Sequence, residues 1–359
     1  MKAALEFFEA TRHGPLGKVR NWLPWRWIGD RGGLSKEPPP NAEAAVEKPE
    51  PGTPKIGLAL SSGGAKGLAH IGVIQVLEEH GIPVHTVAGT SMGAYVGAMW
   101  ASGVDGKGLE ELAAEMRTGS DLWSLVDPVA WPRRGFIRGE KIESRLRATL
   151  GARTFAELEK PLFILATEFD SYARIVFHEG DVASAVLASV AIPGVVVPVR
   201  RGDCEYVDGG VCDPLPVSVL REEVEMNRIV AVNVLPTIEE FNRSRRRVPQ
   251  LGGHPGWKRP FLWLNKKVNW FSRGNLLDIL RSSAMASQMR IVEHSVTLAD
   301  VLIRPVDSKA RWHDYTSFRR YIEVGRKAAE AALPALEAIL EGNAGVPTSE
   351  TESPAVHVD

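Results

Sequence analysis

The stretch KIGLALSSGGAKGLAHIGVIQVLEEHG, residues 55–81, decides the fold. It begins with a short apolar run over 55–62, which is typical of a buried β-strand and leads into glycines. From residue 66 onward, apolar side chains recur every three residues, which predicts a helix that Gly81 can close. These side chains are Leu68, Ile71, Ile74 and Leu77. The stretch therefore predicts a strand, a glycine-rich loop and a helix.

The same alternation continues along the chain. HTVAGTS, residues 85–91, predicts a second strand, and MGAYVGAMWASG, residues 92–103, predicts a helix. Further strands are expected within 161–170, 173–180, 204–210, 228–236 and 301–306, and further helices near 181–191, 276–299 and 318–341. Buried strands that alternate with helices indicate an α/β fold with helices on both sheet faces. Ligands in such folds bind beyond the carboxyl ends of the strands, where SSGGAKG and GTSMG lie.

Composition narrows the class of protein. The 359 residues can bury a substantial core, and the net charge of −1 gives no reason to expect a nucleic-acid partner. With only Cys204 and Cys212, a disulfide framework is excluded and a reducing compartment is favoured. The sequence contains no apolar run of the ~18 residues that span a bilayer. We therefore expect a cytoplasmic protein.

The chain divides into a central domain and two tails. Residues 1–54 are expected to form a flexible tail, because a Trp-rich segment is followed there by a linker rich in Pro, Glu and Ala. Residues 55–340 hold the domain, interrupted over 243–275 by a basic and aromatic insertion. The polar residues 341–359 are expected to form a disordered C-terminal tail.

Gly89-Thr90-Ser91-Met92-Gly93 matches the pattern Gly-x-Ser-x-Gly, with a predicted strand before it and a predicted helix after it. This is the context of a nucleophile elbow, in which a strained turn presents a serine. Side chains at Gly89 or Gly93 would collide with the neighbouring backbone. Alternatively, Ser91 is an ordinary helix N-cap.

The loop after the first strand, Ser61-Ser62-Gly63-Gly64-Ala65-Lys66-Gly67, leaves N–H groups accessible at a helix N-terminus, an arrangement that binds anions. A dinucleotide fingerprint fits poorly, because Ser62 stands at its first glycine and no acid follows at the ribose-binding distance. A P-loop is excluded, because Gly67 follows Lys66. The remaining anion is the oxyanion of an acyl-transfer intermediate.

A nucleophilic serine needs a base. None of the downstream histidines, His178, His254, His294, His313 and His357, lies in a stretch built to present it. Asp208 ends a predicted strand and precedes two glycines, so its carboxylate can project past a tight turn. Desolvation would raise its pKa and make it a better base. The alternative is a turn aspartate that bonds its own backbone.

In order and spacing, SSGGAKG, GTSMG and DGG resemble the motifs of bacterial patatin-like phospholipases, which are similar to the catalytic domain of neuropathy target esterase. GFIRGEKIESRL, TFAELEKPLFILATEFDS and ASVAIPGVVVPV extend the resemblance over roughly 55–340. It implies a three-layer α/β/α fold with a mostly parallel sheet and a Ser-Asp dyad. It also implies hydrolysis of phospholipid, lysophospholipid or other acyl-ester lipids, with no metal or cofactor.

Carried onto this sequence, the resemblance makes Ser91 the nucleophile and Asp208 its base. The oxyanion hole then comprises Gly63, Gly64 and Ala65, supported by Lys66 and Gly67. Two positions depart from the family pattern. Ser62 replaces a glycine, and Lys66 replaces an arginine, which keeps the charge but loses a planar fork of donors.

Residues 255–275 mix aromatic and basic side chains, a combination suited to a lipid interface. Membrane contact is expected at Trp257, Trp263, Lys266, Lys267 and Trp270. Alternatively, these aromatics cover the core and the charges face water. The insertion favours a peripheral protein at the inner membrane face.

A serine lipid hydrolase is the favoured function. An acyltransferase that uses the same acyl-enzyme and a non-catalytic lipid-binding regulator remain alternatives. If Ser91 failed to react with a fluorophosphonate, the non-catalytic alternative would be favoured.

Overall fold

Eight strands form one mixed sheet in a computed structural model that describes residues 54–115, 121, 124–131, 133–224, 226–246, 276–307 and 313–341. The strands are β1 (Ile56–Leu60), β2 (Val84–Thr90), β3 (Leu162–Glu168), β4 (Arg174–Phe177), β5 (Val199–Arg201), β6 (Cys204–Asp208), β7 (Arg228–Val232) and β8 (Val301–Ile303). Each strand hydrogen-bonds to the next along the path β5-β6-β3-β2-β1-β7-β8, and β4 also pairs with β3. The run from β3 through β2, β1 and β7 to β8 is parallel, whereas β4, β5 and β6 pair antiparallel.

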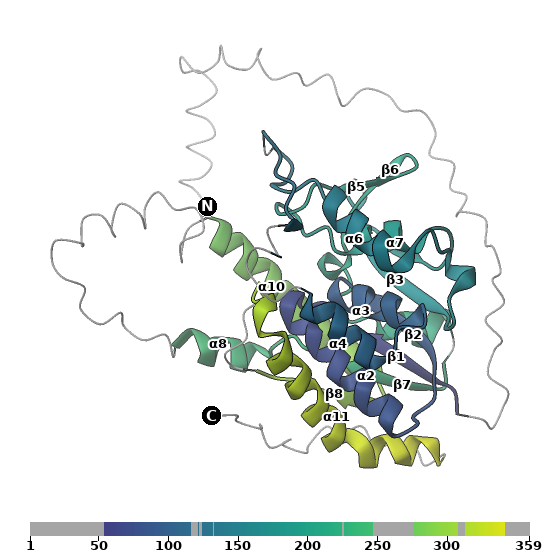
Figure 1. The fold of residues 1–359 in the computed structure, drawn as a ribbon. Helices are drawn as coiled ribbons and strands as arrows, with labels where there is room; N and C mark the ends of the chain where they lie inside the picture. Colours follow the sequence, from purple (N-terminus) through teal and green to yellow (C-terminus); the bar gives the residue numbers. More distant parts are fainter. Residues whose placement is uncertain are drawn as a thin grey trace, which may run out of the picture. The chain divides into compact units, whose positions relative to one another are not determined.

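Helices cover both faces of the sheet (Figure 1). They are α2 (Ala69–Glu79), α3 (Met92–Ala101), α4 (Gly106–Ala114), α6 (Glu140–Leu150), α7 (Val182–Ser189), α8 (Ile238–Arg246), α10 (Leu276–Ser295) and α11 (Phe318–Leu340). The 3-10 turn η2 (Gly64–Leu68) precedes α2, and η4 (Gly209–Val211) follows β6. The expected helix over 66–81 is therefore a 3-10 turn followed by an α-helix.

The alternating side chains of the strands form two cores. On β1, Leu58 and Leu60 pack with α2, α3 and α11, whereas Ala59 faces the other core. That second core contains Leu220 and Val292, from the segment before β7 and from α10. Because successive side chains of a strand point to opposite faces, a sheet buried on both sides needs apolar residues throughout. This arrangement confirms the expected three-layer α/β/α fold with a mostly parallel sheet.

α11 crosses α2 at close range. A methyl group on Gly72 would lie 1.9 Å from the carbonyl oxygen of Ile322, and one on Gly325 would lie 2.0 Å from that of Ala69. Only glycine allows the two backbones to approach this closely. The crossing attaches the C-terminal helix to the helix that follows the glycine-rich loop.

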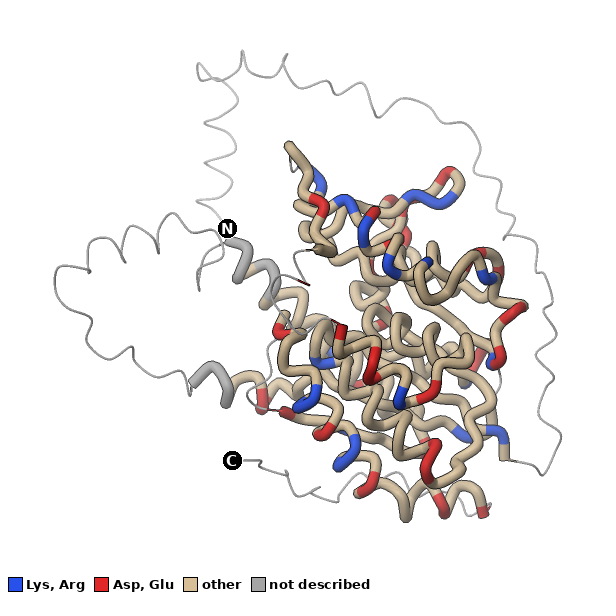
Figure 2. Tube along the Cα trace, in the orientation of Figure 1, with Lys and Arg blue, Asp and Glu red and all other residues tan. Residues whose placement is uncertain are grey.

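Basic and acidic residues are interspersed over the described part of the chain (Figure 2), in keeping with the net charge of −1. Within the same residues, no helix is both long enough and apolar enough to cross a bilayer. The two predicted tails fall outside the described residues, apart from the positions 54 and 341 at their inner ends. Most of the predicted insertion also falls outside them, although residues 243–246 belong to α8.

Candidate active site

Ser91 occupies a strained turn between β2 and α3. Its φ of 54° and ψ of −118° lie where side chains are rarely tolerated. A methyl group on Gly89 would lie 2.6 Å from the carbonyl carbon of Gly93, and one on Gly93 would lie 2.2 Å from the carbonyl oxygen of Leu60. Both flanking glycines are therefore required by backbone packing. Ser91 stands at the N-cap position of α3, but its side chain makes no capping hydrogen bond there.

β3 brings Asp208 to Ser91. β2 pairs with Leu162–Leu165 and ends with Thr90 opposite Leu165. β6 pairs with Ala166–Glu168 and ends with Asp208 opposite Ala166, the next residue along β3. β4 pairs with Ile164–Thr167 of β3, a stretch that includes residues paired with β2 and residues paired with β6. Because a strand has only two edges and β4 takes one of them, β2 and β6 must both lie on the other edge. The two strands therefore meet end to end, and the residues at their ends become neighbours.

The Ser91 hydroxyl donates a hydrogen bond of 2.5 Å to Asp208 Oδ2. The other carboxylate oxygen, Oδ1, accepts a hydrogen bond of 2.7 Å from the N–H of Gly210. Asp208 thus bonds its own turn with one oxygen and the serine with the other. A methyl group on Gly209 would lie 2.3 Å from the carbonyl oxygen of Leu165, so this turn also depends on glycine.

Both side chains are shielded from water, with exposed fractions of 5% for Ser91 and 6% for Asp208. Burial raises the pKa of Asp208 to about 6, although the hydrogen bonds from Ser91 and Gly210 oppose the shift. The carboxylate is therefore a stronger base than an ordinary aspartate and is still ionised at neutral pH. This combination makes a direct proton transfer from serine to carboxylate chemically reasonable.

The glycine-rich loop is held between β7 and the start of α3. The N–H of Ser61 donates to the carbonyl of Val232 at 3.1 Å. A methyl group on Gly63 would lie 2.4 Å from Val234 Cγ2, and one on Gly67 would lie 2.4 Å from Met92 Cγ. Met92 directly follows Ser91, so this contact places η2 beside the elbow. The first N–H groups of a helical turn have no acceptor within it, and Gly64 and Ala65 stand at that position in η2.

His70 forms a hydrogen bond with the glycine-rich loop. It is fully buried, and its Nε2 lies 2.9 Å from the carbonyl oxygen of Ser61, so Nε2 carries the proton and donates. Burial lowers the pKa of His70 to about 4, which keeps the imidazole neutral. His178 packs its ring against Phe163 at a centroid separation of 5.8 Å. His254 and His357 lie outside the described residues.

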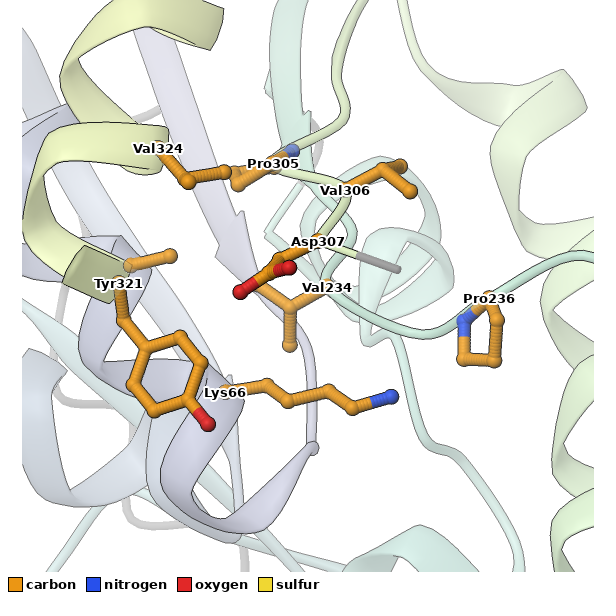
Figure 3. Close-up of a pocket in the computed structure, with 9 residues that line it drawn as sticks. Lys66, Val234, Pro236, Pro305, Val306, Asp307, Tyr321 and Val324 are labelled. Atoms are coloured by element: carbon orange, nitrogen blue, oxygen red, sulfur yellow. The ribbon is translucent and has the colours of Figure 1, made fainter. Parts of the chain in front are cut away.

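Lys66 reaches into a pocket next to the loop (Figure 3). The pocket is lined by Val234 and Pro236, which follow β7, by Asp307, which follows β8, and by Tyr321 of α11. Figure 3 shows the Lys66 side chain extended across this pocket toward Pro236. Its backbone belongs to η2, so Lys66 is part of the predicted loop.

The site contains two polar side chains that sequence reasoning missed. Ser189, at the end of α7, accepts a hydrogen bond of 2.8 Å from the N–H of Ser91. Gln288, on α10, donates a hydrogen bond of 2.9 Å to the carbonyl of Gly210. Ser189 lies in the motif ASVAIPG, which could have drawn attention to it, whereas nothing local marks Gln288. The residues predicted for membrane contact, Trp257, Trp263, Lys266, Lys267 and Trp270, fall outside the described residues.

The chain is similar to known proteins over its central part. Residues 58–221 match the family model described as Patatin-like phospholipase. An uncharacterized NTE family protein of Mycobacterium tuberculosis is 38% identical over 240 residues, which cover 66% of this chain and 62% of that protein. A second such protein from that species is 29% identical over 280 residues, covering 78% of this chain and 46% of the relative.

More distant matches include the lysophospholipase NTE1 of Saccharomyces cerevisiae, 29% identical over 171 residues, which are 46% of this chain and 10% of the yeast protein. Among solved structures, VipD from Legionella pneumophila matches with a TM-score of 0.43 and 14% identity, over 80% of this chain and 67% of VipD. The chain therefore spans less than two thirds of the length of each of the two mycobacterial relatives and of the yeast relative.

Proposed function

Residues 58–221 of this chain belong to the patatin-like phospholipase family, and we propose that the protein is a serine lipid acyl hydrolase in which Ser91 is the nucleophile and Asp208 its base. The observation that carries this proposal is the 2.5 Å hydrogen bond from Ser91 Oγ to Asp208 Oδ2 in a water-shielded elbow. A serine whose proton already points at a raised-pKa carboxylate is arranged for nucleophilic attack.

In the acylation step, Ser91 Oγ attacks the ester carbonyl carbon while its proton passes to Asp208 Oδ2. Negative charge develops on the carbonyl oxygen, and the N–H groups of Gly63, Gly64 and Ala65 receive it. Donors that are already oriented in a dry site stabilise such an oxyanion strongly. The C–O bond to the leaving alcohol then breaks, and the alcohol takes the proton from Asp208. An acyl group remains on Ser91.

In the deacylation step, a water molecule attacks the acyl carbon and transfers its proton to Asp208. The acyl C–O bond to Ser91 then breaks, and Ser91 Oγ takes that proton back. The products are a carboxylic acid and the free serine. Ser189 supports both steps as a positioning residue, because it fixes the N–H of Ser91 and with it the strained turn.

Lipid esters are the proposed substrates. The family to which residues 58–221 belong is named for phospholipases, and the yeast relative is named a lysophospholipase. Peripheral membrane contact through Trp257, Trp263, Lys266, Lys267 and Trp270 belongs to the same proposal, since a lipid substrate has to be taken from a lipid surface.

The proposal is tested by measuring release of fatty acid from a lysophospholipid and of p-nitrophenol from a short-chain ester. Wild type should hydrolyse both, and Ser91→Ala should hydrolyse neither, because no other oxygen replaces Oγ. Ser102→Ala is the matched control, since Ser102 is also a buried serine but bonds the carbonyl of Met99. More than a tenth of the wild-type rate in Ser91→Ala would reject Ser91 as the nucleophile.

A further inference from the structure

The backbone of Asp213 and Pro214 hydrogen-bonds to all three segments of the candidate site. The N–H of Asp213 donates to the carbonyl of Gly209, in the turn that presents the proposed base, at 2.9 Å. The carbonyl of Asp213 accepts a hydrogen bond of 2.8 Å from the hydroxyl of Thr90, the residue before the proposed nucleophile. The carbonyl of Pro214 accepts a hydrogen bond of 2.8 Å from the N–H of Ser62, in the glycine-rich loop. This dipeptide therefore connects the aspartate turn, the elbow and the glycine-rich loop.

The side chain of Asp213 brings a carboxylate into the interior. Asp213 is only 5% exposed. Burial raises the pKa of its carboxyl to about 6, and the neighbouring Arg174 opposes the shift, so the group is ionised at neutral pH. A buried charge is unfavourable unless it is paired and hydrogen-bonded. The position of the dipeptide therefore depends on the cation that pairs with Asp213.

Arg174, the first residue of β4, provides this cation. Its Nη1 lies 3.3 Å from Asp213 Oδ2 and donates a hydrogen bond of 2.7 Å to the hydroxyl of Ser218. That hydroxyl donates in turn to Asp213 Oδ2 at 3.4 Å. The other terminal nitrogen of Arg174, Nη2, donates to Glu223. The guanidinium is thus held between two carboxylates, one of which belongs to the dipeptide.

We infer that the ion pair between Arg174 and Asp213 positions the elbow, the aspartate turn and the glycine-rich loop relative to one another. This inference rests on the proposed function, because it concerns how accurately that site is assembled. Within the described part of the chain, Arg174 bonds neither member of the dyad, so it is a positioning residue that acts through Asp213. A displacement of reacting groups by about 1 Å can lower a rate by about 10²-fold, so a small shift of the dipeptide would slow the reaction.

Arg221 offers a matched control. Its side chain is 33% exposed, against 32% for Arg174, and its Nη2 lies 2.7 Å from Asp300 Oδ2. Asp300 directly precedes β8, and its carboxylate also accepts a hydrogen bond from the N–H of Ile229, near the start of β7. This second ion pair therefore lies at the amino ends of β7 and β8, whereas the elbow follows the carboxyl end of β2. Removing either arginine breaks an ion pair, but only Arg174 should affect the chemistry.

The test is the rate at which a fluorophosphonate labels Ser91, together with kcat/KM for a soluble ester. Arg174→Ala should lower both rates about tenfold, whereas Arg221→Ala should leave both near the wild-type values. Arg174→Lys should recover part of the loss, because lysine keeps the cation but not the planar fork of donors. The melting temperatures of both alanine variants should fall, which separates the effect on chemistry from a general loss of stability.

A double-mutant cycle shows whether Arg174 acts through Asp213. Asp213→Asn keeps the shape of the side chain and leaves no buried charge that needs a cation. In that background, adding Arg174→Ala should lower the labelling rate by less than about twofold, since interacting residues are not additive. An equal loss in both backgrounds would overturn the inference. A loss in Arg221→Ala as large as that in Arg174→Ala would also overturn it.

Wild type distinguishes a failure of this inference from a failure of the proposed function. If the fluorophosphonate does not label Ser91 in wild type, the proposed function itself is wrong. If Ser91 is labelled in wild type and equally fast in Arg174→Ala, only the positioning role of Arg174 is rejected.

Discussion

Ser91 and Asp208 are separated by 117 residues in sequence, yet their side chains are joined by a 2.5 Å hydrogen bond. The contact follows from β3, along one edge of which β2 and β6 end at consecutive positions, Leu165 and Ala166. Because the sheet itself sets this register, the pairing does not depend on a mobile loop to bring the two groups together. Elements of regular structure hold reacting groups more accurately than loops do.

Asp208→Asn should lower kcat by about 10² or more, because an amide keeps the shape of the carboxylate but cannot accept the serine proton. Replacing His178 or His294 with Gln should leave most of the activity. The measurement is steady-state hydrolysis of a soluble ester by the three variants. If either histidine variant lost as much activity as Asp208→Asn, the serine and aspartate would not be acting as a dyad.

The pH dependence of activity should follow the ionisation of Asp208. Its pKa is raised to about 6, and only the ionised form accepts a proton, so kcat/KM should rise with pH through about 6 and then level off. A profile for wild type between pH 4.5 and 8.5, with folding checked at each point, gives the midpoint. A midpoint near 4 would mean that the carboxylate is not desolvated in the working enzyme.

The same raised pKa has a cost in stability. The unfolded chain releases the Asp208 proton near 3.8 and the folded protein near 6, so the free energy of unfolding falls as pH rises between these values. The loss amounts to about 3 kcal/mol, since each pKa unit is worth about 1.4 kcal/mol. Asp208→Asn should therefore raise the melting temperature relative to wild type at pH 7.5 but much less at pH 4. Equal melting temperatures at pH 7.5 would contradict this.

Gly93→Ala should destabilise the protein by about 1–3 kcal/mol or prevent folding, because the new methyl would press on the carbonyl of Leu60 at 2.2 Å. Gly97→Ala is the matched control on the same helix, where the methyl would lie 3.1 Å from Val87 Cγ1. Thermal unfolding of both variants measures the difference. If Gly93→Ala and Gly97→Ala had equal melting temperatures, the elbow would have more space for a methyl group than the 2.2 Å contact indicates.

A quadruple variant, Trp263→Ala, Trp270→Ala, Lys266→Glu and Lys267→Glu, should bind anionic vesicles more weakly while still hydrolysing a soluble ester. Aromatic wedges bind at the headgroup boundary, and lysines are attracted to anionic lipid. Vesicle sedimentation at rising salt should show wild-type binding weakening as charges are screened. Unchanged vesicle binding would mean that these residues have a structural role instead. Loss of both vesicle binding and ester hydrolysis would mean that the aromatic side chains belong to the core.

Local patterns predicted the strand, loop and helix over 55–81, the elbow at Ser91 and the turn at Asp208. Each is encoded by periodicity or by glycines within a few residues, and the structure contains all three. α6 was not predicted, because it buries only Leu146 and Leu150, too narrow an apolar stripe to stand out among its charges. β5 was missed because a three-residue edge strand offers almost no pattern.

The interior of the site could not be predicted from local patterns. Ser189 lies 98 residues from Ser91, and Gln288 lies 78 residues from Gly210, so their roles exist only once the sheet and α10 are assembled. The surroundings of Ser62 could not be predicted from local patterns either. The sequence identifies it as a departure from the family pattern, but only the structure places its hydroxyl beside Gly210.

The central claim is that Ser91 is the acylated nucleophile and that Asp208 activates it. Its most direct test is peptide mapping by mass spectrometry after reaction with a fluorophosphonate, using wild type and Asp208→Asn. We predict one adduct, on the peptide that contains Ser91, formed at least tenfold more slowly in Asp208→Asn than in wild type. An adduct on a different residue, or equal labelling rates in the two proteins, would contradict the account.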